Sequence, residues 1–506
     1  MNQSINRRHF LGASACALFA TGCGGGADAA VSGPDPVTAA NVDLALARLD
    51  PLAADLMART GVPGMAVAVV QGDRTVYAKG FGVRDVESQL PVDADTVFQL
   101  ASLSKSIGAT AVAREVGRGH VRWDQPMREL LPWFALSDPQ ASQLVTVGDL
   151  YSHRTGLPEH AGDRLEDMGF GQREVLERLR YLQLDGFRQK YFYTNFGLTA
   201  AGIAVAERAG MDWATLNEQA IYQPLGMART SSRFADFMAR DNRASGHRRV
   251  DGKWVRNTIR MPDAQAPAAS VTSSVNDLAK WLSMLLGQGV AGGRRVVEAS
   301  ALEAVTTPQV QTASAHYGYG FNVGVTRSGR KSFSHSGAFG MGAATAFKAV
   351  PSTGLAIVVL TNGYPIGVPE SLGEQFFDLV EHGAIQRDWL GVIGPVLTAL
   401  DAPEGKLVGA ARPAAPKPPQ PLSAYAGTYR NDYHGPLRVV MSGDALQLVL
   451  GPAPLQLPLE HWDGDVFTFK LVNESAPPGT VSMASFAGDR VTLEFYDSDG
   501  LGTFVR

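Results

Sequence analysis

Strand-like segments stand at both ends of the first 390 residues of this 506-residue chain, and helical segments fill the middle. The apolar runs 65–70 and 75–80 are separated by Gln-Gly-Asp-Arg, a spacing typical of a β-hairpin. Further predicted strands cover 317–325, 331–336, 342–349 and 355–361. Residues 120–290 have mainly helical patterns with many Gly and Pro breaks. This order predicts an α+β fold in which one sheet is assembled from two distant parts of the chain.

Three helices are expected beside these strands. Apolar residues recur at helical spacing in 37–60 and again in 369–382. A third helix is predicted to open at Ser102 and to run to about Gly117.

A proline-rich segment separates the α+β part from a different C-terminal pattern. Residues 401–420 contain five prolines among several alanines, which indicates a semi-rigid linker. Residues 421–506 alternate apolar and polar residues in short runs between turns, which predicts a small all-β barrel. The predicted domains are therefore an export signal and tether (1–36), the α+β domain (37–400), the linker (401–420) and the barrel (421–506).

Composition excludes several classes of function. With 45 basic and 49 acidic residues and no long basic run, nucleic acid is not an expected partner. Both cysteines, Cys16 and Cys23, lie near the N-terminus, so the body can have neither a disulfide framework nor a thiolate zinc site nor a cysteine nucleophile. The sequence also lacks a His-Glu-x-x-His motif, a P-loop and a Gly-x-Ser-x-Gly elbow, and we expect no metal and no cofactor.

The first thirty residues have the pattern of an export signal. Arg7 and Arg8 precede Phe-Leu and a short apolar stretch, which resembles a twin-arginine signal; an ordinary secretory signal is the alternative. The segment ending at Cys23 resembles a lipoprotein cleavage box, although Ala20 stands where leucine is more usual. We expect a periplasmic protein, and whether a lipid on Cys23 anchors it to a membrane stays open.

Ser102 and Lys105 form a Ser-x-x-Lys pair where an extended segment turns into a helix. Residues i and i+3 share a helical face, so the lysine amine can reach the serine hydroxyl. A serine alcohol is a weak nucleophile until a neighbouring base takes its proton. The pair therefore predicts an acyl-transfer site, against the alternative of an N-capping serine beside a solvated lysine.

Two further segments carry candidate site residues. Tyr193 and Asn195 form a Tyr-x-Asn pair just before an alanine-rich helix; a phenol near an ammonium can act as a base. On a strand predicted to lie at a sheet edge, His335 and Gly337 are followed by Ala338, whose amide is a candidate oxyanion donor opposite the amide of Ser102. Taken singly, each segment also fits a structural role.

Together these motifs resemble the serine β-lactamase and penicillin-binding protein superfamily. They are most similar to its class C-like branch, peptidase family S12, which also holds family VIII carboxylesterases. The resemblance covers about 40–390, and its motifs occur in the family's order: Ser102-x-x-Lys105, Tyr193-x-Asn195, His335-x-Gly337. Segments 149–158, 221–227 and 271–281 also match the family. The C-terminal part is similar to the lipocalin-like barrel appended to some of these peptidases.

The resemblance implies a role for each residue. Ser102 would be the nucleophile, Lys105 and Tyr193 would activate it, and Asn195 would orient the substrate. His335 and Gly337 would line the strand along which the substrate lies. Which of Lys105 and Tyr193 is the acylation base stays open, because the two groups are expected to titrate as a coupled pair.

Two departures from the family pattern bear on the substrate. Many relatives have Lys-Thr-Gly where this chain has His335-Ser-Gly, and a histidine that is mostly neutral at pH 7 suits a substrate carboxylate less well. We therefore expect hydrolysis of short peptides or amides, D-residues included, rather than efficient β-lactam hydrolysis. A carboxylesterase is the alternative, and a binding protein that kept the fold is a third hypothesis. The usual Gly-Gly before segment 271–281 is Ala269-Ser270 here, and the sequence does not specify an oligomeric state.

Overall fold

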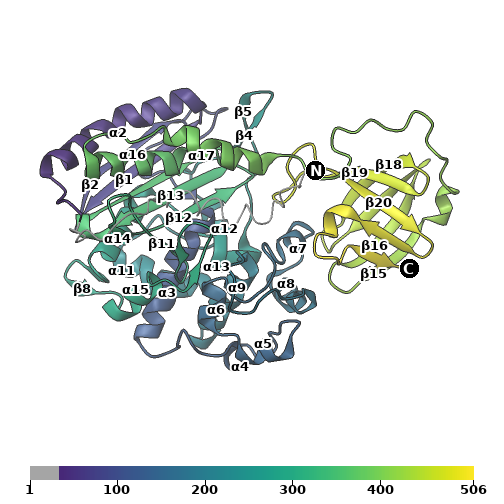
Figure 1. Cartoon of the computed structure of the whole chain (residues 1–506), viewed down its shortest axis with the longest axis horizontal. Coiled ribbons are helices and arrows are strands. Elements are labelled where there is room, and N and C mark those ends of the chain that lie inside the picture. The colour runs from purple at the N-terminus through teal and green to yellow at the C-terminus, as the bar shows by residue number, and fades with distance from the viewer. Residues whose placement is uncertain (1–33) are drawn as a thin grey trace, which may run out of the picture.

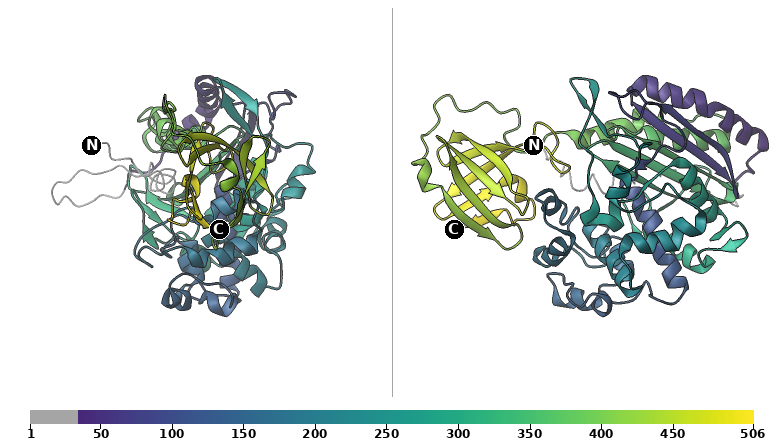
Figure 2. Two further views of the ribbon diagram at one scale, coloured as in Figure 1. Left: turned by 90° about the vertical axis from the view of Figure 1, so that its right-hand side faces the viewer. Right: turned by 180° about the vertical axis from the view of Figure 1, so that it is seen from behind.

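A computed structural model describes residues 34–506 of the chain. The segment with the predicted export signal, Cys16 and Cys23 lies outside the described residues. Within 34–506, no helix combines the length and the apolar character needed to cross a membrane. The described chain forms an α+β body and a separate C-terminal barrel that lies against one end of it (Figures 1 and 2).

The body is built on one antiparallel sheet whose two halves come from distant parts of the sequence. Eight strands lie in the order β2-β1-β14-β13-β12-β11-β10-β9. They are β1 (Gly64–Gln71), β2 (Arg74–Gly82), β9 (Val310–Gln311), β10 (His316–Tyr317), β11 (Asn322–Val325), β12 (Lys331–Phe339), β13 (Ala343–Val350) and β14 (Leu355–Thr361). The pairing of β1 with β14, for example Val67 with Val359, joins the halves. The predicted α+β architecture is thus confirmed.

Two helices cover one face of this sheet (Figure 1). Helix α2 (Ala39–Thr60) begins where the Thr38 side chain accepts the Asn41 amide, and it ends at Gly61 in the left-handed region. Its apolar stripe packs with α16 (Val368–His382) against the apolar side chains of β1 and β14. These buried side chains form a core of their own, which fixes the sheet as a rigid platform.

The other face of the sheet carries the helical middle of the chain. Its longer helices are α3 (Ser104–Gly117), α9 (Asn195–Arg208) and α14 (Val275–Leu286). Shorter ones are α4 (Met127–Leu130), α5 (Pro139–Leu144), α6 (Val147–Tyr151), α7 (Asp163–Asp167), α8 (Gln172–Arg178), α10 (Trp213–Asn217), α11 (Gln223–Leu225), α12 (Phe234–Met238), α13 (Ala266–Ala269) and α15 (Ala299–Val305). Small strand pairs join β3 (Phe98–Gln99) to β6 (Thr272–Ser273), β4 (His247–Val250) to β5 (Lys253–Arg256), and β7 (Val290–Ala291) to β8 (Arg294–Arg295).

The C-terminal part is a closed antiparallel barrel, as its alternating pattern predicted. Its strands are β15 (Gly427–Asn431), β16 (Gly435–Ser442), β17 (Ala445–Leu450), β18 (Leu455–Asp463), β19 (Val466–Lys470), β20 (Val481–Ala487), β21 (Arg490–Leu493) and β22 (Thr503–Val505). Between α17 (Trp389–Thr398) and the barrel, residues 402–420 contain no regular helix or strand. Closure of the barrel leaves no exposed sheet edge.

Three predicted elements differ in detail. The helix expected to open at Ser102 begins as the 3₁₀ turn Ala101–Leu103, and α3 starts at Ser104, because Ala101 adopts a φ of 48° and tightens the chain there. The strand predicted over 317–325 is two strands, since Gly320 turns the chain with a φ of 74°. β12 is not an edge strand along its whole length, because β11 pairs with it up to Ser334.

Candidate active site

Ser102 lies in the tight turn between β3 and α3. Ala101 before it has a φ of 48°, in a region that costs a residue with a side chain about 1 kcal/mol or more. Such strain persists only where surrounding contacts fix the backbone, and these contacts come from the sheet: Thr345 donates its hydroxyl to the Leu100 carbonyl over 2.8 Å. The serine is therefore presented from a fixed turn at the end of the sheet.

Lys105 is completely buried and donates three hydrogen bonds. Its Nζ lies 2.9 Å from Ser102 Oγ, 2.7 Å from Asn195 Oδ1 and 3.1 Å from the Ala268 carbonyl oxygen. These three acceptors match the three N–H donors of an ammonium. A buried charge is tolerated when it is fully hydrogen-bonded in this way.

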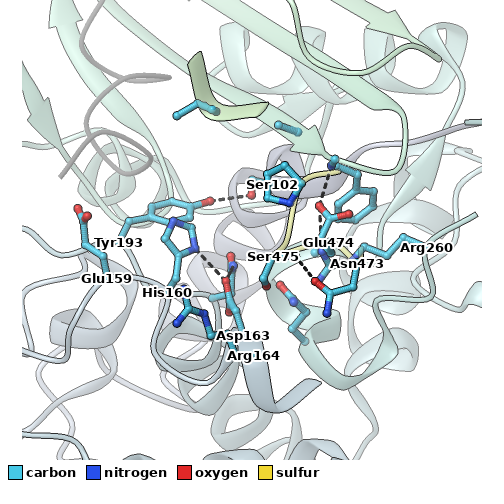
Figure 3. A pocket seen from close by; sticks show the side chains of 18 of the residues that line it. Ser102, Glu159, His160, Asp163, Arg164, Tyr193, Arg260, Asn473, Glu474 and Ser475 are labelled. Atoms are coloured by element: carbon cyan, nitrogen blue, oxygen red, sulfur yellow. Dashed lines mark hydrogen bonds and ion pairs between the residues drawn. The ribbon is translucent and has the colours of Figure 1, made fainter. Parts of the chain in front are cut away.

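The second contact of the serine comes from Tyr193. The phenol oxygen lies 2.7 Å from Ser102 Oγ, and the ring centroid lies 4.6 Å from Lys105 Nζ (Figure 3). The backbone around Tyr193 is held on both sides: its carbonyl accepts the His160 amide, and the next amide, of Thr194, donates to His153 Nδ1. The structure thus brings the phenol of Tyr193 to the hydroxyl and amine of Ser102 and Lys105, although Tyr193 is 91 positions from Ser102 in the chain.

Asn195, at the start of α9, connects Lys105 to a second layer of the site. Its Oδ1 accepts from Lys105, and its Nδ2 donates to Asp163 Oδ2 over 2.8 Å. The same carboxylate oxygen lies 2.8 Å from His160 Nδ1. The sequence analysis missed Asp163 and His160, and their only signal is the i,i+3 spacing that puts them beside each other at the start of α7. Asn195 therefore orients the lysine as well as lining the cavity.

His335 is buried and neutral. Its Nδ1 lies 2.6 Å from the Ser336 carbonyl oxygen, which can only accept, so this nitrogen carries the hydrogen. Its Nε2 therefore accepts from the Tyr317 hydroxyl, at 2.9 Å. Burial, and next the charge of Lys105, lower the pKa of His335 to about 3. The residue that replaces the lysine of many relatives supplies no positive charge near neutral pH.

Gly337 allows the turn that carries Ser102 to pack directly against β12. A Cβ atom at this position would lie 2.1 Å from the Leu100 carbonyl oxygen and 2.4 Å from Thr345 Oγ1, which is too close for any side chain. The next residue, Ala338, is exposed and lines the same cavity as Ser102. Because β11 stops pairing at Ser334, no strand from residues 34–506 pairs with this half of β12 on the cavity side.

The cavity over these residues has a volume of about 260 Å³ and two walls of different origin. One wall comes from the α+β body and contains Ser102, Tyr193 and Ala338. The other comes from the barrel and includes Asn473, Glu474 and Ser475 of the loop between β19 and β20 (Figure 3). Sequence reasoning did not find these barrel residues, because no motif marks them.

The three arginines that line the cavity are each paired with a carboxylate. Arg164 lies 3.2 Å from Glu404 and Arg248 lies 3.4 Å from Asp401. Arg260 lies 2.5 Å from Glu166 and 3.0 Å from Glu474. These positive charges already have partners within the protein.

Two buried carboxyl groups near the cavity have pKa values raised toward neutral pH. Burial raises the pKa of Glu166 to about 7, although Arg260 acts in the opposite direction. Burial also raises the pKa of Glu370, at the start of α16, to about 7. Among residues 34–506, no group of three or more His, Cys, Asp or Glu side chains is arranged to hold a metal ion.

Comparison with known proteins identifies the family. A family model described as "Beta-lactamase" matches residues 49–374, which is more than half of the chain. The chain belongs to this family. It is thus a serine hydrolase of the β-lactamase and penicillin-binding protein type. A second model, described as a domain of unknown function (DUF3471), matches residues 411–503, the barrel region.

Curated relatives of this β-lactamase-family chain have several different names. Unguisins hydrolase ungD of Aspergillus violaceofuscus is 27% identical over 84% of this chain and 82% of its own length. Penicillin-binding protein 4 of Amycolatopsis lactamdurans is 28% identical over 74% of this chain and 95% of its own. Esterase EstB of Burkholderia gladioli is 31% identical over 38% of this chain and 53% of its own.

Solved structures share the fold. An octameric penicillin-binding protein homologue from Pyrococcus abyssi aligns with a TM-score of 0.60 at 22% identity, over 91% of this chain and 99% of its own. A class C β-lactamase from Rhodobacter sphaeroides aligns with a TM-score of 0.55 at 23% identity, over 66% of this chain and 98% of its own. The predicted β-lactamase-like fold is thereby confirmed.

Proposed function

We propose that this protein hydrolyses short peptides or amides, including those with D-residues, through an acyl-enzyme on Ser102. The observation that carries the proposal is the pair of contacts at Ser102 Oγ, 2.9 Å from Lys105 Nζ and 2.7 Å from the Tyr193 hydroxyl. A serine held between an amine and a phenol is arranged for proton removal. The geometry has the nucleophile and the base within hydrogen-bonding reach that this chemistry needs.

Tyr193 is the base of the acylation step in this proposal. The three N–H groups of the Lys105 ammonium all have acceptors, so the charged lysine has no lone pair for the serine proton. A nearby cation stabilises a phenolate, and this phenolate takes the proton as Ser102 Oγ attacks the carbonyl carbon. The backbone amides of Ser102 and Ala338 stabilise the oxyanion that forms.

The same phenol completes the reaction. It gives its proton to the leaving nitrogen as the carbon–nitrogen bond breaks, which leaves the acyl group on Ser102. A water molecule then loses a proton to Tyr193 and attacks the ester carbonyl. The carboxylic product departs as Ser102 Oγ regains a proton from Tyr193. Lys105 keeps its charge throughout and stays hydrogen-bonded to Ser102 Oγ.

Charge in the cavity supports a substrate that needs no carboxylate anchor. His335 is neutral, and the arginines of the cavity wall are paired with carboxylates. A β-lactam or a peptide with an essential C-terminal carboxylate would find weaker recognition here than an amide without one. The relative named as an unguisins hydrolase, which covers most of the chain, is a hydrolase by its name.

A carboxylesterase is the second candidate. One relative is named an esterase, and an oxyanion site with a serine nucleophile serves both bonds. Amide hydrolysis differs in one requirement, because an amine must be protonated before it leaves. Rates on paired amides and esters with the same acyl group therefore separate the two candidates.

The first experiment tests the nucleophile by labelling with a fluorophosphonate, which phosphonylates an activated serine and releases fluoride. We expect stoichiometric labelling of the wild type at Ser102 and none of Ser102→Ala. Ser475→Ala is the matched control, because Ser475 lines the same cavity and hydrogen-bonds to Asp167 and Asn473 through its backbone amide, which alanine retains. A wild type that stays unlabelled would remove the enzyme hypothesis.

The second experiment compares D-alanyl-p-nitroanilide, short peptides of both chiralities and p-nitrophenyl butyrate. We expect Ser102-dependent turnover of the anilide or peptides. Fast ester cleavage with anilide and peptide rates at the background of Ser102→Ala would make the carboxylesterase the better candidate.

We also propose export to the periplasm, which cell fractionation and sequencing of the mature N-terminus would test.

A further inference from the structure

The loop between β19 and β20 of the barrel makes specific contacts with the end of β12. Glu474 Oε1 accepts the Gly340 amide over 2.8 Å, and Oε2 accepts the Met341 amide over 3.2 Å. One carboxylate thus binds two successive N–H groups of the turn between β12 and β13. Hydrogen bonds to a charged acceptor are roughly twice as strong as neutral ones.

Arg260 joins this carboxylate to the body of the enzyme. Its guanidinium lies 3.0 Å from Glu474 Oε1 and 2.5 Å from Glu166 Oε2, and it lies over the Phe339 ring at 5.0 Å. The side chains of Arg260 and Glu474 are only 12% and 14% exposed, so solvent screens their interaction little. The arginine therefore restrains both the barrel loop and the strand residue that follows Ala338.

These contacts surround Ala338 on both sides along the strand. Before it, Gly337 packs against the backbone that carries Ser102. After it, Phe339 lies under Arg260, and Gly340 donates to Glu474. The amide of Ala338 is the proposed oxyanion donor from β12, and β11 gives this half of the strand no support.

The loop itself is braced for this role. Asn473 Oδ1 accepts the Ser475 and Ala476 amides, and the Ser475 amide also donates to Asp167 at the end of α7. Glu474 is thus held between two fixed neighbours rather than at the tip of a loose loop.

We propose that Glu474 is a positioning residue for catalysis. By binding the Gly340 and Met341 amides it holds the end of β12 in place, so that the Ala338 amide can donate to the oxyanion as it forms. The barrel is then a working part of the catalytic machinery as well as a wall of the cavity. Arg260 is needed alongside Glu474. The carboxylate binds Gly340, two residues after Ala338, and without a compensating positive charge it would oppose the negative charge that develops on the oxyanion. This inference rests on the proposed acyl-enzyme function.

The test measures kcat and KM on p-nitrophenyl butyrate and the maximal rate of fluorophosphonate labelling for full-length variants. Glu474→Ala frees the turn, and a misplacement of about 1 Å can cost about 100-fold in rate, so we expect kcat and the labelling rate to fall roughly 10- to 100-fold. KM should change by less than about threefold, because the oxyanion contact is made in the transition state.

Glu474→Gln tests the carboxylate with little change in shape. Its amide oxygen can accept one of the two backbone N–H groups, whereas its NH₂ group cannot accept the other. We expect this variant to have a kcat between those of the wild type and Glu474→Ala. If Glu474→Ala does not fold, the kcat of Glu474→Gln still tests whether Glu474 positions the Ala338 amide.

Phe170→Leu is the control for a loosened barrel. Phe170 packs against Gly435 of the barrel and is not among the residues that line the cavity. We expect its kcat within about twofold of the wild type. The proposal is overturned if Glu474→Ala keeps the wild-type kcat, if only KM rises, or if Phe170→Leu loses as much. An unlabelled wild type would instead refute the proposed function, so the two failures are distinguishable.

Discussion

The floor and the roof of the cavity are built in different ways. The floor, defined by Ser102, Lys105 and Tyr193, directs its polar groups at one oxygen atom. The roof, the loop Asn473–Ser475, directs its carboxylate at backbone amides of the body. The floor thus supplies the reactive groups, whereas the roof supplies shape and position. Substitutions in the floor should therefore cause the largest losses of turnover, and substitutions in the roof should cause smaller ones.

The largest effect is expected from the amine of the floor. Lys105→Met removes the ammonium and leaves the Asn195 and Ala268 oxygens without their donor, so we expect turnover to fall by about 10²- to 10⁴-fold. Steady-state kinetics on the best substrate of the panel would measure it.

Lys348→Met is the matched control for that variant. Lys348 is also buried and paired, with Glu374 at 2.6 Å, but it lies outside the cavity lining. It should lower the thermal midpoint and leave the kcat of the folded enzyme close to that of the wild type. Equal kcat losses in the two lysine variants would contradict the distinction between a catalytic and a structural lysine.

The second-largest effect on rate is expected from loss of the Tyr193 hydroxyl. Tyr193→Phe removes the proposed base, and we expect acylation to slow by about 10²- to 10³-fold. Tyr317→Phe loses a hydroxyl that contacts His335 rather than Ser102, so its loss should stay below about tenfold. Stopped-flow measurement of the acylation phase compares the two. Similar losses would argue against Tyr193 as the base.

The floor was predictable from the sequence because its signals are local. Ser102 and Lys105 are one helical turn apart, so spacing alone places this pair on a common face, and Tyr193 and Asn195 are marked by their short motif beside an alanine-rich helix. The strands of the sheet were also predictable, because their apolar runs are short and separated by turn residues. The resemblance to a known family supplied the order of the motifs and hence their meeting in space.

The roof was not predictable for the opposite reason. Glu474 and Gly340 are 134 positions apart and belong to different folding units, so no periodicity relates them. A glutamate in a loop between two strands looks like a solvated residue in any sequence pattern. The burial of Glu166 and its effect on pKa likewise arise from packing of α7 against distant segments. Such features follow only from the assembled structure.

Gly337 lies between floor and roof, and its substitution should affect both stability and rate. In Gly337→Ala the new methyl group meets the Leu100 carbonyl and Thr345, so the turn that carries Ser102 must move. We expect a loss of about 1–3 kcal/mol in the free energy of unfolding and up to about 100-fold in kcat. Gly324→Ala, where the nearest atom is 3.7 Å away, is the control and should change neither much. Wild-type activity in Gly337→Ala would mean that the turn tolerates displacement.

The last effect is one on stability alone: the buried His335 makes the free energy of unfolding depend on pH. Its folded pKa of about 3 is below the ordinary value of 6.5, so its stabilising contribution is full above pH 6.5 and is lost as the pH falls toward 3. At pH 4.5 an unfolded histidine is charged while the buried one stays neutral, which costs about 3 kcal/mol.

His335→Gln has no group at this position that takes up a proton as the pH falls, and its amide can still bond to Tyr317. Urea unfolding at pH 7 and pH 4.5 should therefore show that the variant loses about 3 kcal/mol less than the wild type between the two conditions. The contribution of His434, whose pKa is lowered by burial away from His335, is the same in both proteins and cancels in this difference. An identical pH dependence in the two proteins would mean that the pKa of His335 is the same in the folded and the unfolded chain. The cavity would then hold a cation for substrate carboxylates below about pH 6.5, which would shift the expected substrate toward penicillin-like compounds under those conditions.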